Sequence, residues 1–133
     1  MSVQWAATGS ESGRFTAIDR CTDLADLSAH FNALRSSGQG YLEVRLQGSE
    51  FPLLTLGFHD DQAVVHLFND ADQCSLLSGD GTAAADSVVQ VPILDDVALF
   101  SGDFVLAVDH AWALLGNFIQ AGSPGELGEW CEL

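Results

Sequence analysis

The fold of this chain is decided by residues 53–68, which read LLTLGFHDDQAVVHLF. Two alternating runs flank Asp60 and Asp61, and this arrangement predicts a hairpin with a two-residue turn. The turn sets residue 59 opposite residue 62. It then pairs Phe58 with Ala63, Leu56 with Val65 and Leu54 with Leu67 on one face, and Thr55 with His66, Gly57 with Val64 and Leu53 with Phe68 on the other. A one-residue slip would turn the apolar face outward, so the turn and the pattern specify the same register.

Further strands are predicted on both sides of this hairpin. The run from Tyr41 to Gln47 alternates apolar and polar residues, which indicates a sheet with one solvent-facing surface. Strands are also predicted at about Gln73 to Leu77 and Ser87 to Ile93, separated by the turn-rich segment from Gly79 to Thr82. Together these segments predict a five-strand antiparallel meander.

Two amphipathic helices are predicted to cover the sheet. The first begins at the capping residues Thr22 and Asp23 and ends at Gly38, and the second is capped by Asp109 and ends at Gly122. Their apolar stripes consist of Leu24, Leu27, Phe31 and Leu34 in the first helix and of Trp112, Leu115, Phe118 and Ile119 in the second. The chain is therefore predicted to be an α+β protein, with a single antiparallel sheet packed against two helices and room for a strand at each end.

Length and composition favour one domain over residues 1–133, because 47% of the residues are hydrophobic and can form a core. Residues 1–20 are only loosely defined, with a short strand at about Val3 to Ala7 followed by a polar link. The chain begins without a basic region and apolar stretch, and no run approaches the roughly 20 apolar residues that span a membrane. We therefore expect a cytoplasmic protein.

The charge of the chain is strongly one-sided. Nineteen acidic residues stand against four arginines and no lysine, for a net charge of -15, and no cation follows Arg45. Such a surface attracts a basic partner and repels nucleic acid and anionic membranes, since no cationic stripe is available to neutralise phosphates. Drift in an Asp-rich genome is the alternative explanation, although it leaves the missing lysine unexplained.

The residues that commonly form metal or catalytic sites do not occur in a recognisable pattern. The three cysteines lack C-x-x-C spacing, and the four histidines lack H-x-H and H-E-x-x-H spacing and are expected to be solvated or at edges. These residues are Cys21, Cys74 and Cys131, and His30, His59, His66 and His110. No catalytic residue, metal site or cofactor is predicted.

Two pairs of adjacent carboxylates, Asp60 with Asp61 and Asp95 with Asp96, could in principle serve as an acid–base pair in a hydrophobic pocket. Turn chemistry explains both pairs without catalysis. At the end of the chain, Trp130 stands among glutamates. It is either an anchor for a partner or a plug at the end of the core.

Several segments, taken in order, resemble immunity protein family 1 of bacterial polymorphic toxin systems. The resemblance runs from about Tyr41 to the end of the chain. It is carried by residues 53–61 (LLTLGFHDD), 65–68 (VHLF), 77–81 (LSGDG), 100–104 (FSGDF) and 122–130 (GSPGELGEW). None of these segments is a catalytic signature.

The resemblance implies a cytoplasmic antidote that binds the catalytic domain of a secreted toxin, most often a zinc-dependent nucleic-acid deaminase such as a DNA cytidine deaminase. The chain lacks the H-x-E and P-C-x-x-C elements of such an enzyme, so it is expected to be the inhibitor. An acidic surface would plug the basic substrate channel. The predicted toxin-binding residues, chosen by charge and loop position, are Asp60, Asp61, Asp80, Asp95, Asp96, Asp103, Glu126, Glu129, Trp130 and Glu132.

Two other classes of function stay open. One is an enzyme or small-ligand-binding domain on a curved antiparallel sheet, which a pocket holding a buried Asp or His with a shifted pKa would favour. The other is an acidic adaptor for some other basic protein. A toxin reading frame beside the gene would distinguish an antidote from an adaptor.

Overall fold

The computed structural model describes residues 2–9, 12–122 and 127–132. The predicted hairpin lies at the centre of its main sheet, where β4 (Leu53–His59) pairs with β5 (Gln62–Phe68). All seven predicted residue pairs occur in the predicted register. Asp60 adopts a left-handed conformation, with φ of 53°, as a tight hairpin turn requires.

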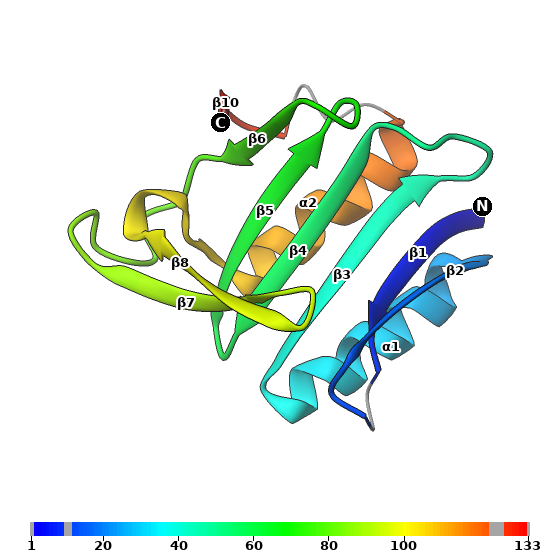
Figure 1. Cartoon of the computed structure of the whole chain (residues 1–133), viewed down its shortest axis with the longest axis horizontal. Coiled ribbons are helices and arrows are strands. Elements are labelled where there is room, and N and C mark those ends of the chain that lie inside the picture. Colours follow the sequence, from blue (N-terminus) through cyan, green and yellow to red (C-terminus); the bar gives the residue numbers. More distant parts are fainter. Residues whose placement is uncertain (1, 10–11, 123–126, 133) are drawn as a thin grey trace.

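The main sheet is antiparallel throughout and follows the order β10-β6-β5-β4-β3-β1-β2, with β9 added at the start of β5 (Figure 1). The remaining strands of this sheet are β1 (Ser2–Thr8), β2 (Phe15–Asp23), β3 (Gln39–Leu46), β6 (Cys74–Leu77), β9 (Leu106–Ala107) and β10 (Trp130–Glu132). The α+β fold and the antiparallel sheet are thus as predicted, and strands occur near both ends of the chain.

The predicted polar link after β1 is wrong, because its last six residues, 15–20, belong to β2. This strand lies at the edge of the sheet and pairs only with β1. Thr16, Ile18, Asp19 and Arg20 are all exposed, so the segment lacks the alternation that marks a half-buried strand.

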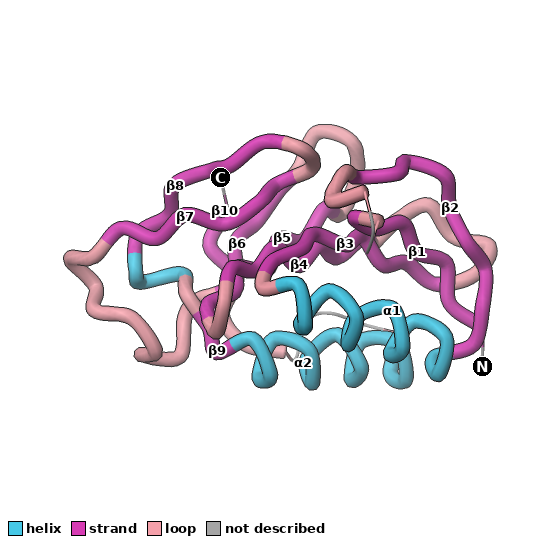
Figure 2. The backbone as a smooth tube through the Cα atoms, turned by 90° about the horizontal axis from the view of Figure 1, so that it is seen from below, coloured by secondary structure: helices cyan, strands magenta, loops and turns pink. Residues whose placement is uncertain are grey.

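Two helices, α1 (Leu24–Ser37) and α2 (Val108–Ala121), lie side by side on one face of the main sheet (Figure 2). Asp23 caps α1 by accepting a hydrogen bond from the Asp26 N–H at 3.0 Å, and Gly38 ends the helix with φ of 96°. The predicted cap of α2 is wrong: the helix starts at Val108, so Asp109 lies in its first turn. The capping position is Ala107, whose N–H donates to the carboxylate of Asp80 in another segment.

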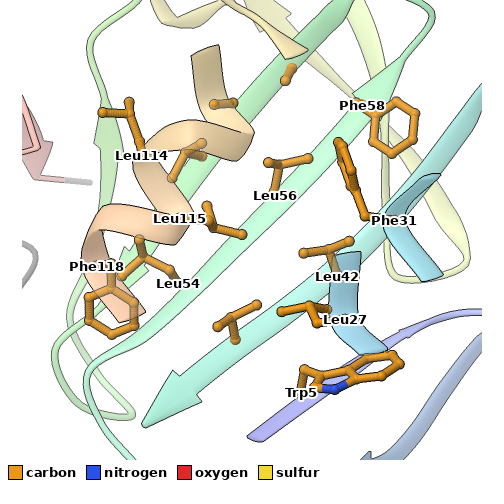
Figure 3. Close-up of a cluster of buried hydrophobic side chains, with 14 of the residues drawn as sticks. Trp5, Leu27, Phe31, Leu42, Leu54, Leu56, Phe58, Leu114, Leu115 and Phe118 are labelled. Carbon is orange, nitrogen blue, oxygen red and sulfur yellow. The ribbon is translucent and has the colours of Figure 1, made fainter. Parts of the chain in front are cut away.

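The main core lies between the sheet and the two helices (Figure 3). It contains the six apolar side chains that the hairpin register assigns to one face. Phe31 of α1 joins the layers, because its ring lies 5.7 Å from that of Phe58 and stacks on Trp112 of α2 at 4.1 Å.

The opposite face of the sheet is covered as well, so the predicted solvent-facing surface is wrong. β7 (Val88–Ile93) does not extend the meander but pairs with β8 (Asp96–Ser101) in a separate hairpin that lies across this face (Figure 2). A second cluster of buried residues forms underneath, consisting of Val64, Leu76, Val89, Val91 and Val105. Gly57 of β4 permits this close approach, because a Cβ there would collide with the Pro92 carbonyl oxygen. A short 3-10 helix, η1 (Gly102–Phe104), follows β8.

Candidate functional site

The two halves of the chain differ in charge. Four arginines and five acidic residues precede Gln47, which gives this half a net charge of -1, and the fourteen acidic residues that follow carry the other -14 of the total of -15. The first half contains α1 and the strands β1, β2 and β3. Two of its arginines are engaged there, because Arg45 pairs with Asp19 and Arg20 lies over the Trp5 ring. The negative charge therefore belongs mainly to the elements from β4 onward.

Two carboxylates and one backbone carbonyl oxygen meet around Arg35 at the end of α1. The β4–β5 turn and the start of α2 lie at this same end of the molecule (Figure 1). The Arg35 guanidinium lies 3.6 Å from Asp61 Oδ1 and 3.4 Å from Asp109 Oδ1, and it donates to the Asp60 carbonyl oxygen at 3.2 Å. The Asp61 and Asp109 side chains are 91% and 83% exposed. One guanidinium leaves an excess of negative charge here, and the pairs are too exposed to add much stability.

The turn of the β7–β8 hairpin brings Asp95 and Asp96 to this end. The Phe15 N–H donates to Asp95 Oδ1 at 2.6 Å, which ties the turn to β2. A cavity of about 290 Å³ separates the turn from Ser37 and Gln39, and both aspartates line it. We call the five carboxylates Asp60, Asp61, Asp95, Asp96 and Asp109 the acidic end.

Asp80, another predicted contact residue, is committed to internal structure. Its carboxylate accepts hydrogen bonds from the N–H and hydroxyl of Thr82 and from the Ala107 N–H, and it lies 2.9 Å from His110 Nδ1. Burial alone would raise the pKa of Asp80, but these hydrogen bonds hold it well below its usual value. The residue therefore joins the loop after β6 to the start of α2, with only 20% of its side chain exposed.

A second cavity, of about 280 Å³, lies beside Asp80 and is also lined by Ser78, His110 and Glu129. A serine, a histidine and an aspartate in one cavity suggest acyl transfer, which would need nearby N–H donors for an oxyanion. The N–H groups of Ser78, Gly79 and Asp80 instead donate to the carbonyl oxygens of Glu129, Asp103 and Val105. These three N–H groups are therefore not free to bind an oxyanion.

The other predicted contact residues are divided between two places. Asp103 lies in η1, where its carbonyl oxygen accepts a hydrogen bond from the Gly79 N–H. Glu129 is exposed, and Glu132 lies opposite Ser75 in the edge strand β10. Trp130 is half-buried and packs against the main core, as the plug interpretation predicts. Glu126 lies outside the described residues.

Two histidines depart from the prediction of solvated or edge positions: His30 is half-buried with Nε2 2.8 Å from the Thr8 carbonyl oxygen, and His66 is half-buried on β5. His66 lies on the hairpin-covered face, with its ring 5.4 Å from that of Phe100, and its Nδ1 atom is buried without a hydrogen-bond partner. Burial lowers the pKa of His66 to about 4, because a charged imidazole would lose its hydration. Across the described residues, no three His, Cys, Asp or Glu side chains are arranged to hold a metal ion.

Two features of the surface were missed by the sequence reasoning. Asp109 was taken only as a helix cap, and no sequence signal places it beside the β4–β5 turn. The apolar residues Val88, Val97 and Leu99 of the β7–β8 hairpin are exposed. The run of apolar residues from Val97 to Phe100 was a usable signal for a second strand after residue 95.

No protein-family model matches this chain, and no curated protein is significantly similar to it. The resemblance to immunity protein family 1 therefore stays a prediction. Among the helices of the described segments, none has the length and apolar character needed to cross a membrane.

Proposed function

We propose that this chain is an immunity protein that binds and neutralises a cognate secreted toxin in the cytoplasm. The toxin is a zinc-dependent nucleic-acid deaminase, with DNA cytidine deaminases as the preferred class. The chain blocks the basic substrate channel of the toxin with an acidic surface and performs no chemistry itself.

The acidic end is the observation that carries this proposal. Its five carboxylates come from the β4–β5 turn, the β7–β8 turn and the start of α2, and Arg35 pairs with two of them, Asp61 and Asp109. An enzyme that grips a polyanion needs a positive channel, and a rigid negative surface can occupy that channel in place of phosphates.

Charge and tight binding contribute differently in such a complex. Long-range attraction between the acidic end and a basic channel raises the association rate, and salt weakens it. The dissociation rate depends on a few well-packed contacts that lose their water. Inhibition should therefore become slower to establish as ionic strength rises.

Co-expression tests the function directly. Bacteria that produce one of a panel of secreted-toxin deaminase domains should survive when this chain is present, and the purified pair should form a complex without deaminase activity. The proposal requires that this chain rescue the bacteria from at least one deaminase of the panel. Failure to rescue against every deaminase would refute it.

A matched pair of double variants tests the acidic end. Asp60→Asn with Asp61→Asn and Asp70→Asn with Asp72→Asn each change the net charge by two, at opposite ends of β5. We expect the first variant to slow association about threefold to tenfold at low salt and the second to have less effect. Equal effects of both variants, or association rates that do not change with salt concentration, would contradict the proposal that the acidic end plugs the channel.

A further inference from the structure

The β7–β8 hairpin has two faces of different exposure. Its inner face places Val89, Val91 and Phe100 against the main sheet. The outer face carries Val88, Val97 and Leu99, which are 67%, 64% and 63% exposed. The register confirms that these three share a face, because Val97 pairs with Pro92, Leu99 with Gln90 and Val88 with Ser101.

This outer face concentrates the exposed apolar surface of the molecule. The described residues include five exposed large hydrophobic side chains, and four of them belong to this hairpin: Val88, Leu94, Val97 and Leu99. Strand conformation does not require apolar side chains at these exposed positions, because a β-branched polar residue such as Thr favours a strand equally well. A contiguous apolar face on an otherwise charged protein is typical of an interaction surface.

Charge indicates what covers this face. The apolar stripe ends at Asp95 and Asp96, so it is continuous with the acidic end. A second copy of the chain would bring another net charge of -15 to the same place, and the two copies would repel. A basic protein is attracted to the acidic turn and can bury the apolar stripe beside it.

We propose that the outer face of the β7–β8 hairpin, together with Asp95 and Asp96, is the surface on which the toxin's basic domain docks. This inference rests on the proposed function and names the contact that makes inhibition tight. The acidic turn sets the approach and register, and Val97 and Leu99 are the anchors that lose their water in the complex.

Polar substitutions that preserve strand conformation test the surface. The double variant Val97→Thr with Leu99→Thr removes apolar contact without changing charge. Ile18→Thr is the control, because Ile18 is 74% exposed and is the fifth exposed hydrophobic residue. It lies on β2 and not on the hairpin, although Phe15 at the start of β2 contacts Asp95. Binding is measured by kinetics with the deaminase domain that co-expression selects, and folding by thermal unfolding of each variant.

We expect the double variant to weaken binding by about 30-fold or more, mainly through faster dissociation, while Ile18→Thr stays within about twofold of the wild type. Unchanged dissociation in a folded double variant, with a wild type that still neutralises the toxin, would overturn this docking surface alone. A wild type that neutralises no deaminase would overturn the proposed function and this inference with it. A wild-type dimer in sedimentation that the double variant abolishes would assign the face to a second copy and overturn the proposal.

Discussion

The two faces of the main sheet are covered in different ways. Within the described part of the chain, the helix-covered face buries a hydrophobic cluster of 22 residues, whereas the cluster beneath the hairpin has five. The first also includes most of the large buried side chains, such as Trp5, Phe58 and Phe118. The second contains the unpaired His66 nitrogen, and its hairpin exposes apolar residues on the outside. The comparison indicates that the helix-covered face contributes most of the free energy of unfolding. It also indicates that the hairpin can open or be substituted without unfolding the rest of the protein.

Truncation of one phenylalanine on each face gives the largest expected difference. Phe58→Ala empties a fully buried position beneath α1 and should lower the free energy of unfolding by about 4 kcal/mol. Phe100→Ala, at a half-buried position of β8, should cost about 1 to 2 kcal/mol because the hairpin can settle into the space. Denaturant unfolding measures both values. Equal losses would show that the two faces contribute alike.

The variant Gly57→Ala should weaken the contact between the β7–β8 hairpin and the main sheet without disturbing the helix-covered face. The added Cβ would meet the Pro92 backbone, so the hairpin must shift, and we expect a loss of about 2 kcal/mol. Amide hydrogen exchange should accelerate in β7 and β8 while α1 and α2 keep their protection. Gly116→Ala is the control, because nothing surrounds that Cβ position on α2, and Ala should be neutral or stabilise the helix by up to about 1 kcal/mol. Faster exchange throughout the protein would contradict a hairpin that moves independently.

The smallest effect at neutral pH concerns His66. The pKa of His66 is about 4 in the folded protein and about 6.5 when unfolded, so the unfolded state binds more protons between these values. Protonation of His66 in the unfolded state therefore costs no stability above pH 6.5 and lowers the free energy of unfolding progressively as the pH falls toward 4. His66→Leu should raise the free energy of unfolding by about 1 kcal/mol at pH 7, since it removes the unpaired nitrogen.

The same variant should also lose less stability than the wild type between pH 6.5 and pH 4. Unfolding in urea at several pH values measures the difference between the two proteins, which cancels the titration of the other histidines. Parallel pH profiles would mean that the pKa of His66 is the same in the folded and unfolded states, which would contradict its burial as a neutral imidazole.

The helix-covered face could be predicted from the sequence because its signals are local. The Asp60–Asp61 turn and the flanking alternation specify one register, and Gly38 and Gly122 mark the helix ends. Alternation in β7 shows that one side of the strand is buried, but it does not say against which surface. The strand was therefore assigned to the meander, although it pairs with β8 on the other side of the sheet.

The candidate site could be predicted only in part, for the same reason. Charge and turn composition identify Asp60, Asp61, Asp95 and Asp96 as exposed loop carboxylates. The meeting of Asp61 with Asp109 depends on where α2 starts relative to the β4–β5 turn, which is a tertiary property. Asp80 looks the same in the sequence, yet its hydrogen bonds to Thr82 and Ala107 make it a structural residue.

The arrangement of β1 has a consequence for biosynthesis. This strand is paired on both edges, by β2 and by β3, and both partners come from the first 46 residues. A nearly neutral layer of three strands and α1 can therefore assemble at the ribosome before the acidic half has been translated. The mutual repulsion of the later carboxylates then acts on a nascent chain that already has a template for β4 along the edge of β3.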